Sequence, residues 1–180
     1  NLMLIVLVGK SASGKTTLEK YISDNFRYDK IVSCTTRPMR QDEVYGEDYY
    51  FISEDKFEEM LVHDELVEHA TFNGWSYGIS KKEIEEKKDG VVVVNPAGLR
   101  KLRKLDIPMS VFYVVCDDKT RYKRSIDRGD DIVEVALRSR SDTDCFNGIE
   151  DEVDRVLLGT NTVESNTVEV FEVVARKNKE

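Results

Sequence analysis

The first residues in this sequence whose types and spacing could do chemistry lie between positions 9 and 17. Residues 9–16 read Gly-Lys-Ser-Ala-Ser-Gly-Lys-Thr and match the phosphate-binding pattern G-x-x-x-x-G-K-[S/T] at each fixed position. Such a loop wraps so that successive backbone N–H groups point at phosphate oxygens. Lys15 is then expected to reach the outer phosphates of a nucleoside triphosphate, and the Thr16 hydroxyl to bind Mg²⁺. The expected triphosphate contacts are Gly9, Ser11, Ala12, Ser13, Gly14, Lys15, Thr16 and Thr17.

The elements that must position this loop are visible on both sides of it. Residues 3–8 form an unbroken apolar run, which is typical of a strand buried on both faces. After the loop, Leu18, Tyr21, Ile22 and Phe26 recur at helical spacing. The loop therefore opens a helix, and a helix N-terminus favours anions. An ordinary strand–turn–helix corner is the alternative, but the motif in this context favours a triphosphate site.

Composition excludes several other functions. A net charge of −8 argues against a general nucleic-acid binder, and 180 residues suit one domain. No apolar run approaches the ~20 residues that a membrane span needs. Cys34, Cys116 and Cys145 are scattered without metal-ligand spacing, which predicts reduced thiols in a cytoplasmic protein. His63 and His69 also lack partners at metal-ligand spacing, so we interpret them as non-ligands.

Strands and helices alternate along the chain. Strands are expected at 49–52, 91–94, 111–115 and 155–158. Helices are expected after Ser53, from Ser80 to Gly90 behind a capping box, at 118–128 and at 130–140. The segment 168–175 fits either a strand or a helix. Strands separated by helices predict an α/β fold with a parallel sheet.

Residues 33–49 resemble the nucleotide-binding segment of guanylate kinases. The matching residues are Ser33-Cys34-Thr35-Thr36-Arg37-Pro38-Met39-Arg40, Glu43, Val44, Gly46, Asp48 and Tyr49, followed by Glu68, Gly74, Tyr77 and Gly78. With the phosphate loop, the resemblance extends to about residue 140. It implies a P-loop nucleoside monophosphate kinase whose parallel sheet carries an inserted subdomain and a short lid. We therefore expect one domain over 1–180, with a core at about 1–32 and 90–180, a GMP-binding subdomain at about 33–89 and a lid at about 124–140.

The chemistry of this segment suits a nucleoside monophosphate. Its phosphate needs planar, bidentate donors, for which arginine is better suited than lysine, and Arg37 and Arg40 are the candidates. Tyr49 and Tyr77 can add phenol O–H donors to the phosphate. Guanine presents N1–H and an exocyclic amine, and the carboxylate of Glu68 could accept from both.

Two positions depart from the family pattern. The residue after the Tyr-Gly pair, usually a hydroxyl residue that touches the base, is Ile79 here, and Ser80 follows it. Ser80 could contact the base, although it fits a helix cap better, and Ser33 could bind the base as well. After the 91–94 strand, where the family carries acidic residues, the chain has Asn95, which could hydrogen-bond a ribose or a metal-bound water. Metal binding would then rest on Thr16, the triphosphate and water.

The third group of arginines suits phosphoryl transfer, which needs positive charge around the moving group. By resemblance, Arg124, Arg128 and Arg138 are lid arginines that close over the triphosphate. The alternative is a pair of salt-bridged surface helices.

The sequence thus predicts a kinase that transfers phosphate from ATP to GMP or dGMP, with Mg²⁺ bound to ATP. Two alternatives remain open: a kinase of the same fold with another phosphorylated acceptor, and a non-catalytic protein-binding module. No nucleic acid, membrane or obligate protein partner is expected. The predicted catalytic residues are Lys15, Arg37, Arg124 and Arg138; Arg128 joins the loop residues as an ATP contact; the predicted GMP contacts are Ser33, Arg37, Arg40, Tyr49, Glu68, Tyr77, Ser80 and Asn95.

Overall fold

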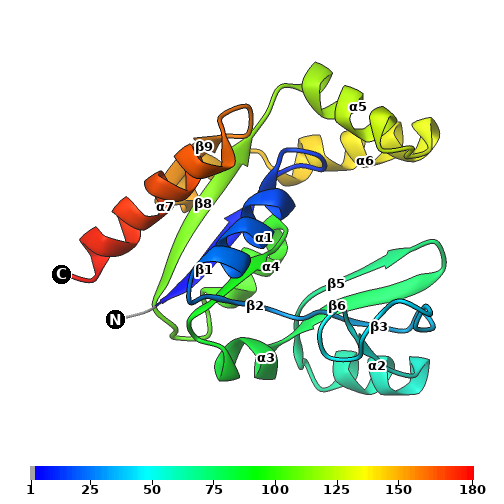
Figure 1. Ribbon diagram of the computed structural model, residues 1–180. Coiled ribbons are helices and arrows are strands. Elements are labelled where there is room, and N and C mark those ends of the chain that lie inside the picture. The colour runs from blue at the N-terminus through cyan, green and yellow to red at the C-terminus, as the bar shows by residue number, and fades with distance from the viewer. Residues whose placement is uncertain (1–2) are drawn as a thin grey trace.

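The structure is a computed structural model that describes residues 3–180. Its larger sheet has five strands in the order β2-β7-β1-β8-β9, and each neighbouring pair runs parallel (Figure 1). These strands are β1 (Leu4–Val8), β2 (Asp29–Lys30), β7 (Gly90–Val93), β8 (Met109–Val115) and β9 (Arg155–Leu158). The predicted parallel α/β sheet is confirmed.

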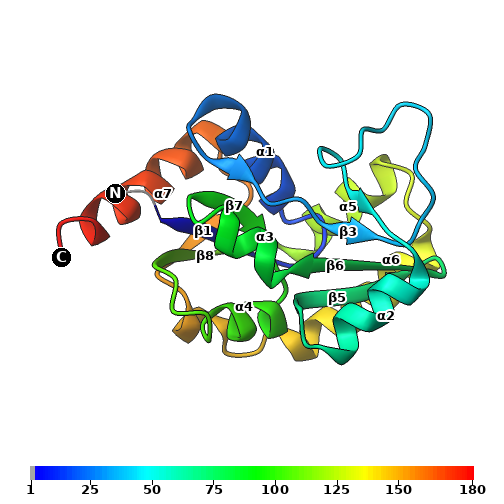
Figure 2. The ribbon, with the colours of Figure 1, turned by 90° about the horizontal axis from the view of Figure 1, so that it is seen from below.

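Helices cover both faces of this sheet, which explains why every residue of β1 is buried. Helices α1 (Lys15–Asn25) and α7 (Val163–Lys177) lie on one side, and α4 (Pro96–Leu102) lies on the other (Figure 2). Side chains alternate along β1, so that Ile5 and Leu7 face α1 and α7 while Leu4 and Val6 face α4. The sheet edge from which the β1–α1 loop emerges is therefore held by packing on both faces.

Residues 34–80 form a second sheet with the order β4-β3-β6-β5. Its elements are β3 (Cys34–Thr35), β4 (Tyr50–Phe51), α2 (Glu54–Val62), β5 (Leu66–Phe72) and β6 (Trp75–Ser80), and α3 (Lys81–Glu86) follows it. Cys34, Phe57 and Leu66 form its small core. The sequence analysis did not predict the β5–β6 hairpin. Asn73-Gly74 would have indicated it, because both residues have positive φ, as tight hairpin turns require.

The chain then forms α5 (Asp118–Asp127), α6 (Ile132–Cys145) and the short 3₁₀ helix η1 (Ile149–Glu152). Helices α5 and α6 lie beyond the end of the sheet (Figure 1). The ambiguous last segment is helical, because Val170, Val173 and Val174 bury one face of α7 against the sheet. Within residues 3–180 we find no helix that combines the length and apolar character of a membrane span.

Three expected boundaries were wrong. The helix that begins after Ser80 ends at Glu86 rather than near Gly90, because Gly90 already pairs with Asp29 as the first residue of β7. The helix expected at 130–140 extends to Cys145. The strand expected at 49–52 contains only Tyr50 and Phe51.

Candidate nucleotide-binding site

The phosphate loop connects β1 to α1 at the end of the central strand. Gly14 (φ 104°) and Ala12 (φ 60°) both adopt positive φ, so the backbone turns twice before α1 begins at Lys15. A pocket of about 420 Å³ opens over the loop. It is lined by the predicted residues Ala12, Ser13, Gly14, Lys15, Thr16 and Thr17, by Leu18, by Arg124 and Arg128, and by Gly159, Asn161, Val163 and Asn166. Its size and polar floor suit a nucleotide.

The segment between β9 and α7 closes the far side of this pocket. Gly159 lies so near the loop that an added Cβ would stand 1.9 Å from the Ser13 carbonyl oxygen. Asn166 is buried, and its side-chain amide donates to the Leu158 carbonyl at 3.0 Å. The sequence analysis did not single out Asn166. Its spacing from Val170 and Val173 was the available signal, because it places a polar residue on the buried face of α7.

Lys15 is the first residue of α1, and its Nζ reaches back over the loop to donate to the Lys10 carbonyl at 3.0 Å. Burial lowers the pKa of Lys15 to about 8, against the opposing attraction of Asp142 and Glu68. A half-buried ammonium is well suited to receive a phosphate, because the phosphate oxygens replace the hydration that the surrounding protein has removed.

The α5 arginines do not all face the pocket in the same way. Arg124 donates to the Ala12 carbonyl at 3.2 Å and to the Gly159 carbonyl at 2.9 Å, so it also ties the loop to β9. Arg128 lines the pocket but pairs with Asp130 at 3.0 Å. Arg121, which the sequence analysis did not select, is buried and donates to the Ser11 carbonyl at 3.3 Å.

Helix α6 approaches the loop from the same side. The Asp142 carboxylate accepts from the Ser11 backbone N–H at 3.3 Å. Arg138, one helical turn earlier, lies over the ring of Phe72 with 4.4 Å from its guanidinium carbon to the ring centroid. Arg138 thus faces the second sheet rather than the 420 Å³ pocket. Sequence analysis selected Arg138 but neither Asp142 nor Phe72; the i, i+4 spacing of Arg138 and Asp142 places both on one helix face.

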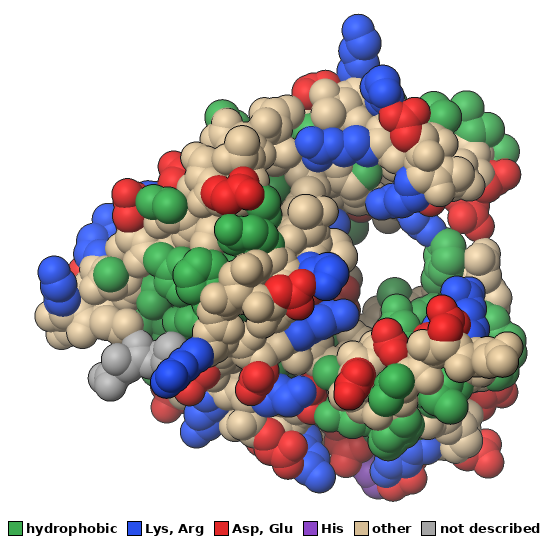
Figure 3. Space-filling model, in the orientation of Figure 1, with side chains coloured by type: hydrophobic (Ala, Val, Ile, Leu, Met, Phe, Trp, Pro, Cys, Tyr) green, Lys and Arg blue, Asp and Glu red, His purple; other side chains and the backbone are tan. Residues whose placement is uncertain are grey.

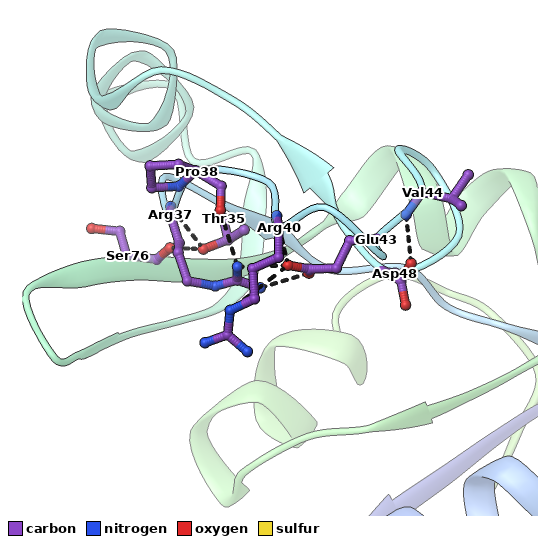
Figure 4. Close-up of polar contacts among 8 residues, drawn as sticks. All are labelled: Thr35, Arg37, Pro38, Arg40, Glu43, Val44, Asp48 and Ser76. Carbon is purple, nitrogen blue, oxygen red and sulfur yellow. Dashed lines mark hydrogen bonds and ion pairs between the residues drawn. The ribbon is translucent and has the colours of Figure 1, made fainter.

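The two arginines expected at the acceptor phosphate have different surroundings (Figure 4). Arg37 forms a bidentate pair with Glu43, with both N–O distances 2.7 Å, and lies 5.6 Å from the Tyr49 ring centroid. The hydrogen bonds from Arg37 lower the pKa of Glu43. The Arg40 side chain is 73% exposed and reaches Glu43 only at 4.0 Å. Arg37 is therefore fixed in orientation, whereas Arg40 is accessible to a ligand.

Glu68 on β5 points toward the end of the large sheet. Its Oε2 accepts from the Asn95 backbone N–H at 3.0 Å, and an added Cβ on Gly98 would stand 3.0 Å from the same oxygen. Burial raises the pKa of Glu68 to about 7, although the Asn95 bond and the charge of Lys15 act in the opposite direction. Asn95 follows β7, which pairs with β1, so this hydrogen bond brings the second sheet to the edge of the large sheet that carries the phosphate loop.

Comparison with known proteins decides the family. The guanylate kinase family model matches residues 2–176. This chain belongs to the guanylate kinase family. It is 36% identical to the guanylate kinase of Lactobacillus johnsonii over 77% of this chain and 72% of that protein. It is 38% identical to the guanylate kinase of Trichormus variabilis over 75% of this chain and 71% of that protein.

A solved structure supports the fold. The guanylate kinase from Anaplasma phagocytophilum superimposes with a TM-score of 0.64 and 21% identity, covering 97% of this chain and 86% of that one. At this identity the likeness concerns the fold alone.

Two residues predicted as GMP contacts in this guanylate kinase family member have local structural roles. Ser80 Oγ accepts from the Glu83 N–H at 3.1 Å and caps α3. A capping box also requires the Glu83 carboxylate to accept from the Ser80 backbone N–H, and this part of the prediction was wrong. The Glu83 carboxylate accepts from the Val32 N–H and the Tyr50 hydroxyl instead. Asn95 Oδ1 caps α4 by accepting from the Gly98 N–H at 2.7 Å, and the contact of Asn95 with a ribose or a metal-bound water stays a prediction.

Ile79, at the family's hydroxyl position, is buried in the core. Ser33 is half-buried, and its carbonyl accepts from the Tyr50 N–H at 2.9 Å. Tyr49 and Tyr77 lie together with ring centroids 5.9 Å apart. Among the residues predicted to contact the base, Glu68 and Ser33 are the two that do not cap a helix.

The donor set for a metal is small. Across residues 3–180 no group of three or more His, Cys, Asp or Glu side chains could hold a metal ion. Thr16 lines the nucleotide pocket beside Lys15. This arrangement fits a Mg²⁺ ion that keeps several waters and is bound mainly through triphosphate oxygens.

Proposed function

We propose that this protein catalyses the ATP-dependent phosphorylation of GMP or dGMP to GDP or dGDP. The observation that carries the proposal is the hydrogen bond from the Asn95 N–H to Glu68 Oε2, which joins the second sheet to the end of β7, beside β1 and the phosphate loop. A triphosphate site and a base site would then face each other across the active-site opening. Nothing favours the two alternatives that the sequence left open.

In the donor site, ATP would occupy the pocket over the loop. The contacts we propose are Gly9, Ser11, Ala12, Ser13, Gly14, Lys15, Thr16, Thr17 and Arg128. Thr16 would hold Mg²⁺, which supplies charge neutralisation on the β- and γ-phosphate oxygens when bound. The half-buried ammonium of Lys15 would bind the outer phosphates.

In the acceptor site, the Glu68 carboxylate would accept from guanine N1–H and from the exocyclic amine. Arg37, Arg40, Tyr49 and Tyr77 would bind the monophosphate. Ser33 is a further candidate for the base, whereas the cap bonds of Ser80 and Asn95 leave them only a secondary part.

The transfer itself requires positioning and positive charge more than covalent chemistry. The acceptor phosphate is already anionic, so no general base is needed. Lys15, Arg37, Arg124 and Arg138 would stabilise the charge on the phosphoryl group as it moves in line from ATP to GMP. Helices α5 and α6 would act as the lid. A cytoplasmic location and the lack of nucleic acid or obligate protein partners remain predictions.

The test is ADP release in a coupled assay across the common nucleoside monophosphates. GMP should be preferred over AMP by about 10⁴ or more in kcat/KM, because adenine N1 is an acceptor and would leave the buried carboxylate unpaired. Lys15→Ala should abolish turnover with the fold intact by circular dichroism. Lys20→Ala is the matched control, because Lys20 is exposed on the same helix and pairs with the exposed Asp24. A better rate with AMP or a pyrimidine monophosphate would overturn the guanine assignment.

A further inference from the structure

The tip of the β5–β6 hairpin touches the lid. The ring of Phe72, the last residue of β5, lies under the guanidinium of Arg138 on α6 at 4.4 Å. This cation–π contact joins the subdomain proposed to bind the acceptor with the helices proposed to cover the donor. Figure 3 shows an opening between these two parts, with side chains meeting on its outer side.

Helix α6 is fixed independently of Phe72. Asp142 accepts from the Ser11 N–H at 3.3 Å, and the Ser139 hydroxyl is hydrogen-bonded to Tyr122 on α5. Arg138 and Ser11 also line one small cavity, which places the stem of Arg138 near the loop. The helix backbone therefore has its own anchors, and Phe72 affects mainly where the guanidinium lies.

The other partner of Arg138 is weak. Glu134 Oε2 lies 3.7 Å from Arg138 Nη2 on the same helix. The side chain of Arg138 is 35% exposed and that of Glu134 is 39% exposed. Exposed pairs of this kind contribute little to side-chain order. The aromatic face is the contact that can hold the guanidinium across the opening, and stacking leaves the in-plane N–H groups free to donate to phosphate oxygens.

Phe72 also shares a strand face with the base-recognition residue. Pairing between β5 and β6 is regular from Glu68↔Ile79 to Phe72↔Trp75, so Glu68 and Phe72 are four residues apart on one face of β5. The strand that presents the carboxylate to guanine thus carries the ring beneath Arg138.

We propose that Phe72 is a positioning residue for Arg138, holding its guanidinium between the donor and acceptor sites for phosphoryl transfer. This inference rests on the proposed function. Phe72 and Glu68 share β5, so the subdomain proposed to bind the acceptor itself carries the ring that holds the Arg138 guanidinium.

The experiment compares Phe72→Leu with Phe72→Tyr in steady-state kinetics. Phe72→Leu keeps an apolar side chain but removes the aromatic face, so kcat should fall about 3- to 10-fold. KM for ATP and for GMP should change by less than about twofold, because the contact acts on the transferring group rather than on ground-state binding. Phe72→Tyr keeps the ring face and should retain the wild-type kcat.

A double-mutant cycle shows whether the effect passes through Arg138. In the Arg138→Ala background, Phe72→Leu should have no further effect on the residual kcat. Trp75→Leu is the matched control, because Trp75 pairs with Phe72 across the hairpin and also anchors its turn. Equal losses in Trp75→Leu, additive losses with Arg138→Ala, or an unchanged kcat in Phe72→Leu would each overturn the proposal. A wild type that is inactive with GMP would instead reject the proposed function.

Discussion

At the scale of single residues, the site holds two ionisable groups whose charged forms are destabilised by desolvation. The pKa of Lys15 is lowered to about 8, and that of Glu68 is raised to about 7. Near pH 7 Glu68 is thus close to its titration midpoint, whereas Lys15 is still mostly charged, and a bound ligand of the right charge shifts both protonation equilibria. A phosphate favours the charged lysine, and guanine favours the charged carboxylate.

Glu68 therefore predicts a pH dependence of acceptor binding. The raised pKa means that the carboxyl keeps its proton up to about pH 7, and only the ionised form accepts from both guanine donors. The KM for GMP should fall as pH rises from about 6 to about 8. Glu68→Gln should lose this slope and part of its preference for GMP over AMP. The phosphate of GMP titrates in the same pH range whichever protein is used, so Glu68→Gln is the control for that effect. If the KM for GMP changed with pH in the same way in the wild type and in Glu68→Gln, the prediction would be contradicted.

At the scale of elements, the phosphate loop depends on the segment that follows β9. Arg124 of α5 binds carbonyls on both sides of the junction, Ala12 in the loop and Gly159 after β9. The backbone of Gly159 and that of Ser13 are in such close contact that no side chain fits between them. Loop shape is thus set by three elements far apart in sequence.

Gly159→Ala should consequently damage the donor site. Its Cβ would stand 1.9 Å from a backbone oxygen that cannot rotate away, so β9 or the loop must shift. Overpacking of this kind costs about 1–3 kcal/mol, equivalent to a fall in Tm of roughly 3–10 °C, and ATP affinity should fall with it. Thermal unfolding and ATP titration measure both. Thr160→Ala, at the exposed next residue, should leave both unchanged. Wild-type ATP affinity in Gly159→Ala would show that the loop does not depend on this contact.

At the scale of the whole molecule, the proposed donor and acceptor sites lie on different sheets. The donor pocket lies at the end of the five-stranded sheet, and the acceptor phosphate would lie on the four-stranded one. The lid helices contact both, at Ser11 and at Phe72. Ligand affinities should therefore be separable by mutation, whereas turnover needs all three parts.

Arg40→Ala tests this separation. Arg40 is the accessible guanidinium of the acceptor sheet, so its loss should raise the KM for GMP roughly 10-fold, the usual scale for a hydrogen bond to a charged group. The Kd for ATP should stay within about twofold, because the donor pocket is built from other elements. Arg27→Ala removes the same charge from an exposed position after α1 and is the control. An equal loss of ATP affinity in Arg40→Ala would argue that Arg40 has a structural role.

The sequence by itself determined the parts that consecutive residues specify. The phosphate loop, its buried strand and the helix after it are local patterns, and the fold class follows from the alternation of strands and helices. The helix caps at Ser53 and Ser80 are likewise local, because a cap involves residues three apart. The β5–β6 hairpin is also specified by consecutive residues, and the Asn73-Gly74 turn that indicates it was missed.

Only the tertiary structure decided which residues far apart in the sequence contact one another. The Glu68 carboxylate meets the backbone of Asn95, and Asp142 meets the loop at Ser11. Phe72 lies under Arg138. None of these pairs follows from residue type or spacing, because each depends on where two sheets and a helix pair come together. Burial, and with it the pKa of Glu68, is likewise a property of the assembled molecule, since it depends on which atoms exclude water.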